Sequence, residues 1–190
     1  MAKRFFDLKI DVYVPGRWSL AEPMDSKGEQ IEDIWQFIDG GRVADPGLLR
    51  IPLFETGRPL DIEFAGAGQT PIVSTRVASV LSAMAPHDVQ LFPVEVEGQA
   101  EPYHLLNVAR TVRCVDEARC EEARLWTLDD GQPDKVGRYH VIAGLRIDKS
   151  KVADERVFRL WGWSSPIIVD GEVKEALERT GLVGGRFDEV

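Results

Sequence analysis

Two segments of the chain share the same spaced set of residues, and this recurrence constrains the fold more than any other feature. Equivalent positions lie 96 residues apart, or 95 residues apart at the Pro-Ile pairs. We therefore expect one strand–turn–helix element to be built twice, with most of its glycines and prolines serving turns. The first segment has Leu49-Arg50-Ile51, Gly66, Pro71, Ile72, Val77 and Leu81, and the second has Leu145-Arg146-Ile147, Gly162, Pro166, Ile167, Val173 and Leu177.

The hydrophobic pattern predicts an α+β fold with a mostly antiparallel sheet, a few short helices and two strand–turn–helix pseudo-repeats. Residues 5–14 alternate between apolar and polar, which predicts a half-buried strand with Asp7 and Lys9 facing solvent. Apolar residues at helical spacing predict helices over residues 31–38 and after Ser74 and Asp170, which are in position to cap them.

Residues 49–53 and 60–64 are short alternating runs separated by a turn sequence. We expect them to form a hairpin with Asp61 and Glu63 on its solvent face.

Residues 116–138 form the least regular stretch of the chain. They are charged, and Asp129-Asp130-Gly131 and Pro133 favour turns. We expect a surface excursion with one helical turn around residues 117–125.

Composition narrows the classes of partner. The 190 residues carry a net charge of −9, which disfavours binding to nucleic acid or an anionic membrane and favours a basic partner. No apolar run approaches the ~18 residues of a membrane span, and Asp7 and Lys9 interrupt the early apolar stretch, so we expect a cytoplasmic protein. Cys114 and Cys120 are expected to stay thiols there.

The residues predict no catalytic, metal or cofactor site. The turn at 66–70 lacks the lysine of a phosphate-binding loop, and Ser74 is better explained as a helix cap than as a nucleophile. No histidine of the chain has the spacing of a metal site. His104 and His140 lie in predicted strands, where they could be neighbours with Cys114 or Cys120 completing a site, but ordinary partly buried histidines are the favoured interpretation.

Tryptophans next to turns and acidic residues are the best candidates for a partner-binding surface. Trp126 lies within the acidic excursion beside Asp129 and Asp130. Trp161 and Trp163 alternate, so one of them should face outward and serve as an interface anchor. We predict that Trp126, Asp129, Asp130 and Trp163 contact the partner; packing under loops and simple solubilisation are the alternative explanations.

Several longer motifs resemble one family. The chain is similar to the bacterial polymorphic-toxin immunity proteins, in the eleventh immunity family, formerly a domain of unknown function. The resemblance covers about residues 49–190, with residues 1–48 as an N-terminal strand and helix extension of a single domain, 1–190. The motifs are Pro71-Ile72-Val73-Ser74, Val89-Gln90-Leu91-Phe92-Pro93-Val94, Tyr103-His104-Leu105-Leu106-Asn107-Val108, Val157-Phe158-Arg159-Leu160, Ile168-Val169-Asp170 and Gly185-Arg186-Phe187.

The resemblance implies a protein that binds a cognate toxin domain and neutralises it by stoichiometric inhibition, without catalysis of its own. A basic nuclease is one toxin class that suits the acidic charge, because opposite charges speed encounter. Two alternatives stay open: a small enzyme that uses the turn at residues 66–74 with His104 or His140 as base, and an accessory subunit of a secretion system. The oligomeric state is left open.

Overall fold

The structure is a computed structural model that describes residues 3–190. Within this range the strands form two five-stranded sheets and two two-stranded ribbons. The first sheet has the order β14 (Gly185–Glu189), β1 (Phe5–Ile10), β13 (Trp163–Asp170), β12 (Val157–Leu160) and β9 (Thr111–Val112). The second has the order β3 (Leu49–Ile51), β7 (Val89–Val96), β8 (Tyr103–Val108), β6 (Thr70–Ser74) and β5 (Ile62–Ala65). The ribbons pair β2 (Ser19–Leu20) with β4 (Leu53–Glu55) and β10 (Glu122–Leu125) with β11 (Tyr139–Ala143).

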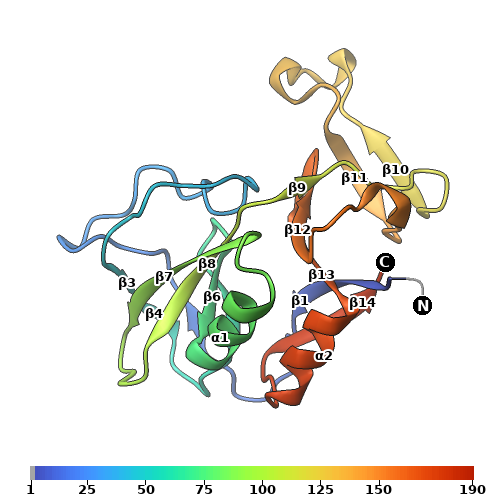
Figure 1. Cartoon of the computed structure of the whole chain (residues 1–190). Helices are drawn as coiled ribbons and strands as arrows, with labels where there is room; N and C mark the ends of the chain where they lie inside the picture. Colours follow the sequence, from blue (N-terminus) through green and yellow to red (C-terminus); the bar gives the residue numbers. More distant parts are fainter. Residues whose placement is uncertain (1–2) are drawn as a thin grey trace.

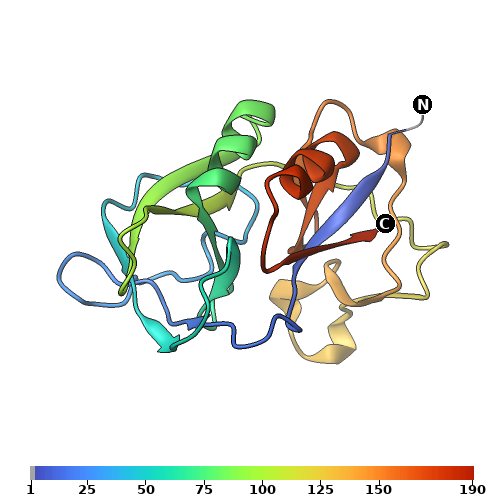
Figure 2. The ribbon, with the colours of Figure 1, turned by 90° about the horizontal axis from the view of Figure 1, so that it is seen from below.

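Two α-helices, α1 (Thr75–Met84) and α2 (Gly171–Arg179), lie side by side between the two sheets (Figures 1 and 2). Val77 and Leu81 of α1 and Val173 and Leu177 of α2 enter one hydrophobic core that also takes residues from both sheets. Short 3-10 turns complete the described elements: η1 (Leu128–Asp130), η2 (Pro133–Lys135) and η3 (Lys149–Lys151). The predicted α+β class with mostly antiparallel pairing is confirmed.

The recurrence in the sequence corresponds to a repeated structural unit. The strand order β5-β6-β8-β7 in one sheet matches β12-β13-β1-β14 in the other, and each unit has its helix after its second strand. Even the register agrees, because Ser74 pairs with Tyr103 while its equivalent Asp170 pairs with Phe5. An offset of 96 residues therefore relates β6, α1 and β7 to β13, α2 and β14, and β1 completes the second unit.

Two parts of the predicted repeat are wrong. Leu49–Ile51 is the parallel edge strand β3 beside β7, whereas Ile147 makes only an isolated bridge to Val115, so the Leu-Arg-Ile triplets are not equivalent. The predicted hairpin between residues 49–53 and 60–64 is also absent from the described chain, because β5 pairs with β6 instead. Alternation identifies a strand but does not select its partner.

The predicted helices over residues 31–38 and around 117–125 are wrong as well. Residues 31–38 form turns, where Asp33 accepts a hydrogen bond from the Trp35 backbone N–H at 3.0 Å, and Trp35 is half exposed. Most of residues 117–125 belongs to a turn and to strand β10. Local side-chain hydrogen bonds and strand pairing outweigh short apolar spacing at these positions.

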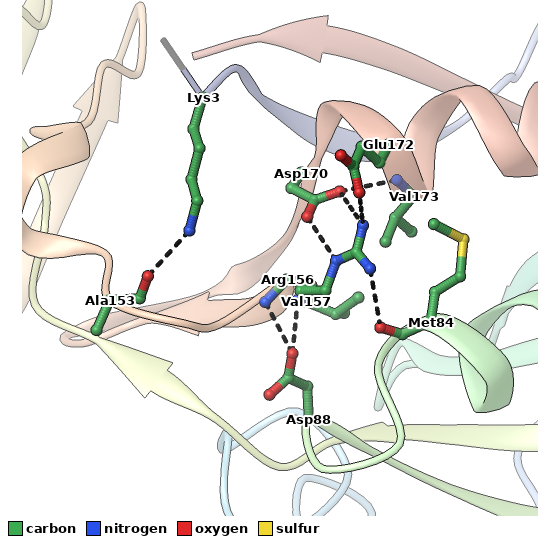
Figure 3. A network of polar contacts seen from close by, with 9 residues as sticks. All are labelled: Lys3, Met84, Asp88, Ala153, Arg156, Val157, Asp170, Glu172 and Val173. Carbon is green, nitrogen blue, oxygen red and sulfur yellow. Dashed lines mark hydrogen bonds and ion pairs between the residues drawn. The ribbon is translucent and has the colours of Figure 1, made fainter. Parts of the chain in front are cut away.

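An arginine network joins the two units on one side (Figure 3). Arg156, just before β12, donates from Nε to Asp170 at 2.7 Å and from Nη2 to Glu172 at 2.5 Å, both at the start of α2. Its Nη1 donates to the carbonyl of Met84 at the end of α1, 3.3 Å away. Asp88, which follows α1, accepts the backbone N–H groups of Arg156 and Val157.

The other side of the interface has an equivalent network of opposite polarity. Here Arg76 comes from the start of α1 and donates two hydrogen bonds to Asp61, each at 2.5 Å. Its Nη1 donates to the carbonyl of Thr180, the residue equivalent to Met84, at 3.3 Å. Asp61 also accepts from Ser74 Oγ and from the backbone N–H of Val183. In both networks a guanidinium lies at the carbonyl end of the other unit's helix, where positive charge is favourable.

Asp61 and Glu63 are therefore buried, and their predicted place on a solvent face is wrong. Glu63 pairs with Arg17. Glu63 is in β5, as predicted, whereas Asp61 immediately precedes that strand. Both acids are buried, and distant arginines neutralise them.

We predict that Asp61→Ala destabilises the fold by about 2–3 kcal/mol, because it leaves the Val183 N–H and Arg76 without their acceptor. Urea unfolding measures the change. Asp129→Ala, which removes an exposed aspartate, should stay within about 0.5 kcal/mol of the parent. Equal stability of the two variants would contradict this role for Asp61.

Asp7 is also buried, with 6% of its surface exposed, contrary to the predicted half-buried strand. β1 is an inner strand: Phe6 and Leu8 enter the core beside the helices, and Phe5 enters a second core with Phe158. Burial raises the pKa of Asp7 to about 6, even though Lys9 Nζ lies 3.5 Å from its carboxylate.

Because the folded-state pKa of Asp7 lies above its ordinary value of 3.8, folding favours the protonated acid, and stability is lost as pH rises from about 4 through 6. We predict that Asp7→Asn is more stable than the parent at pH 8, by up to about 3 kcal/mol, and that this gain disappears near pH 4. Urea unfolding across this range measures it. A gain independent of pH would contradict the assignment.

Candidate functional site

A projecting arm, defined as residues 116–143, extends beyond both five-stranded sheets (Figure 1). Its stem is the β10–β11 ribbon, with an irregularity between Arg124 and Leu125, and its tip carries η1 and η2. Tyr139 is the one buried residue of the arm. The predicted surface excursion is therefore present, although it is built as a ribbon.

The tip is held by a capping box. The backbone N–H and Oγ1 of Thr127 both donate to Asp130, at 2.8 and 2.9 Å, and Gly131 adopts a left-handed conformation that ends the turn. The Thr127 N–H holds the pKa of Asp130 below its ordinary value. Asp129 beside it is exposed and makes no side-chain hydrogen bond or ion pair with residues 3–190.

Trp126 fastens the tip to the stem. Its ring stacks on the imidazole of His140, with centroids 3.7 Å apart and planes at 20°, and Lys135 Nζ lies 5.1 Å from the ring centroid. The Trp126 backbone N–H donates to the Arg138 carbonyl at 2.8 Å. This predicted contact residue thus also has a structural role.

Exposed apolar side chains gather on the arm and at its base. Leu128 is 75% exposed, and Leu125, Val136 and Trp161 are more than a third exposed. The arm also carries seven Asp and Glu residues against four Lys and Arg residues. Apolar side chains surrounded by charge are typical of a protein-binding surface.

A cleft of about 440 Å³ opens at the base of the arm. The Tyr139 N–H donates to the carbonyl of Gly162, which places the stem against the turn between β12 and β13. Thr111 Oγ1 donates to the Gly40 carbonyl at 2.6 Å and so brings Asp39 to the opposite wall. The lining residues are Asp39, Thr111, Arg138, Leu160, Trp161, Gly162, Trp163 and Ser164.

Arginines dominate the charged groups around this cleft. The Arg113 guanidinium lies 4.2 Å from the centroid of the Trp161 ring, and Arg138 lines the wall. Behind the wall, Arg159 is 1% exposed and donates from Nη1 to the carbonyls of Ser164 and Ser165, at 2.7 and 2.9 Å. Burial lowers the pKa of Arg159 to about 10.

The four predicted contact residues lie at different distances from the tip of the arm. Asp129 and Asp130 are at the tip, Trp126 is fixed between tip and stem, and half-buried Trp163 lines the cleft. Arg138 links the last two, because its carbonyl binds Trp126 and its residue lines the cleft beside Trp163. The structure does not join all four in one contact patch.

Sequence reasoning missed Asp39, Arg113, Arg138 and Arg159. They come from four separate segments, and no short-range spacing connects them. Of the residues around the cleft, only Trp161 and Trp163 were recognisable from the sequence as candidates for an interface, because they lie on either side of Gly162.

The alternative enzyme hypothesis requires the turn at residues 66–74 with His104 or His140, and the structure does not assemble the 66–69 turn and the histidines into one site. Residues 66–69 form the β5–β6 turn, with strand β6 between that turn and α1, and the Gly68 N–H donates to Glu22. His104 is in β8 and His140 is in β11, which belong to different sheets, so the two histidines are not neighbours in one sheet. Burial lowers the pKa of His104.

Three further features of the described residues concern metal binding, thiol reactivity and membrane insertion. Residues 3–190 contain no cluster of three or more His, Cys, Asp or Glu that could hold a metal ion. Cys114 is a buried free thiol whose pKa is raised to about 12 by burial, which leaves it protonated. None of the helices in the described range has the length and apolar character needed to cross a bilayer.

We predict that Trp126→Ala loosens the arm without unfolding the protein, because it removes the ring stacked on His140. Hydrogen–deuterium exchange should rise in residues 122–143, while exchange in α1 and α2 stays at the parental rate. Trp35→Ala, at an exposed tryptophan outside the arm, is the control. Unchanged exchange in the arm would show that the stack does not hold it.

Comparison with known proteins gives one match. The family model described as "Immunity protein family (Imm11)" matches residues 21–190, and so reaches into the segment that the motifs had left outside the likeness. None of the curated proteins matches the chain.

Proposed function

Since this chain belongs to the Imm11 immunity protein family, we propose that it neutralises a cognate toxin by binding it stoichiometrically, without chemistry of its own. The family supports a role in toxin immunity. The observation that supports a binding mechanism is the arm, which combines exposed apolar side chains with a stiff base. We propose that it acts in the cytoplasm, and that residues 1–190 act as one domain because a single core joins both units.

The arm is suited to occlusion of an active site. Leu125, Leu128 and Val136 supply apolar contact area, and the Trp126–His140 stack and the capping box limit the entropy lost when the tip is bound. In this proposal the tip enters or covers the toxin's active site, and the cleft at the base takes a second contact.

Charge supports a basic partner for the tip. The chain carries a net charge of −9, and Asp129 has no partner among the described residues. A toxin with a basic surface, such as a nuclease, would associate faster because of this field. Nuclease activity is therefore our proposal for the toxin.

The deciding experiment is to identify what the adjacent gene encodes and, where it encodes a secreted toxin, to co-express the toxin domain with this chain. We expect this chain to restore growth and to co-purify with the toxin domain in a fixed molar ratio. Turnover of the toxin or its product by the purified chain would favour the enzyme alternative. Stable association with secretion components, and none with the toxin, would favour the accessory-subunit alternative.

We predict that Asp129→Lys slows association with the toxin domain by about tenfold at low salt and weakens the salt dependence of the rate. Stopped-flow measurements over a salt series test this. Glu175→Lys on α2 makes the same charge change on an exposed helix position outside the arm and should have a smaller effect. Asp130 is unsuitable for this test because its carboxylate holds the tip turn. Equal rates for both variants would remove Asp129 from the interface.

A further inference from the structure

We infer that the cleft at the base of the arm binds a carboxylate side chain of the partner protein. This inference rests on the proposed function, because it takes the toxin as the partner. It assigns the base of the arm a charge preference opposite to that of the tip.

The local charge supports an anionic ligand. Arg138 and Asp39 line the cleft, Arg113 stacks on Trp161 of its wall, and buried Arg159 lies behind Ser164. The formal charge of these four side chains is +2. None of the four makes an ion pair with another residue of the described range. In a chain of net charge −9, a group of unpaired arginines at one cleft is an exception to the overall balance.

Arg159 is the strongest single observation. It is 1% exposed, its Nη atoms donate only to carbonyls of Phe37, Ser164 and Ser165, and its Nε has no hydrogen-bond partner. Burial of a charge without an ion-pair partner is unfavourable. Asp39 and Asp7 favour the charged form of Arg159, but burial outweighs them, so its charge is only partly compensated. Ser164 lines the cleft, so an anion bound there would lie close enough to this guanidinium to offset part of that cost.

Arg113 and Arg138 are positioned to bind the oxygens of a carboxylate. Stacking on Trp161 holds the Arg113 guanidinium flat and leaves its N–H edge available, and a planar guanidinium matches the two oxygens of a carboxylate. Arg138 extends from the stem of the arm. Trp161 and Trp163 form apolar walls, which strengthen a charge-assisted hydrogen bond by excluding water.

The opposite charges of the tip and the cleft favour one orientation of the bound partner. An acidic tip and a basic cleft at opposite ends of the arm favour a partner with the reverse pattern, in one orientation only. A partner docked the other way round would bring like charges together at both ends.

The test needs no toxin. The full chain labelled with ¹⁵N is titrated with glutarate, and in parallel with 1,4-diaminobutane, at constant ionic strength. The indole N–H signals of Trp161 and Trp163, assigned with Trp161→Phe and Trp163→Phe, report on the cleft. We expect both signals to shift saturably with glutarate and not with the diamine. A response to the diamine alone, or to neither compound, would overturn the inference.

Variants separate a specific site from general charge. Arg138→Gln and Arg113→Gln should each raise the dissociation constant for glutarate roughly tenfold. Arg179→Gln, at an exposed residue at the end of α2, should leave it unchanged. Asp39→Asn should tighten binding, because it removes the one carboxylate. Equal effects of all three arginine substitutions would also overturn the inference.

The outcome is independent of the test of toxin neutralisation. If the chain binds glutarate in the cleft but fails to protect against the toxin, the inferred site is supported and the proposed function is contradicted. A chain that protects, with protection unaffected by Arg138→Gln and no response to glutarate, would retain the function and lose the site.

Discussion

Two arginine-centred networks hold the two structural units together, and the rest of the molecule depends on them. Arg156 binds carboxylates at the start of α2 and a carbonyl at the end of α1, whereas Arg76, at the start of α1, binds Asp61 just before β5 and a carbonyl after the end of α2. The two networks occupy equivalent places with donor and acceptor roles exchanged between strand and helix. Such an arrangement fixes α1 against α2, and so places the two sheets on either side of one core.

The candidate site is attached to the second structural unit. β12 and β13 belong to the second unit, and the turn between them carries Trp161, Gly162 and Trp163 to the base of the arm. The ribbon of the arm packs on that turn through Tyr139, whose N–H binds the Gly162 carbonyl. Buried Arg159 lies behind the same turn and ties it to the segment that carries Asp39. The arm is thus an extension of the repeat and not a free loop.

This arrangement agrees with a protein that acts by shape and charge. The described chain uses Asp61 and Asp170 in structural ion pairs and does not assemble the histidines and the 66–69 turn into one site. Its exposed features are apolar side chains on a stiff arm, with acidic groups at the tip and arginines at the base. Membership of the Imm11 family indicates a role in toxin immunity.

Much of the local structure could be read from the sequence. The 96-residue offset predicted the repeated unit, and periodicity predicted α1 and α2, with Asp170 as a cap whose carboxylate accepts the Val173 N–H at 2.8 Å. Residue chemistry also placed Trp126 within the surface excursion. These features depend on residues a few positions apart, or on a pattern repeated in order along the chain.

Only the tertiary structure decided which segments meet. Strand β1 joins the second unit across more than 150 residues, and this burial of both faces of the strand is why Asp7 is not in solvent. Asp61 and Glu63 are buried because Arg76 and Arg17 neutralise them, and the cleft exists because three separate segments meet at the turn between β12 and β13. Hydrophobic periodicity reports which side of an element is apolar, whereas pairing and charge compensation depend on residues far away in the chain.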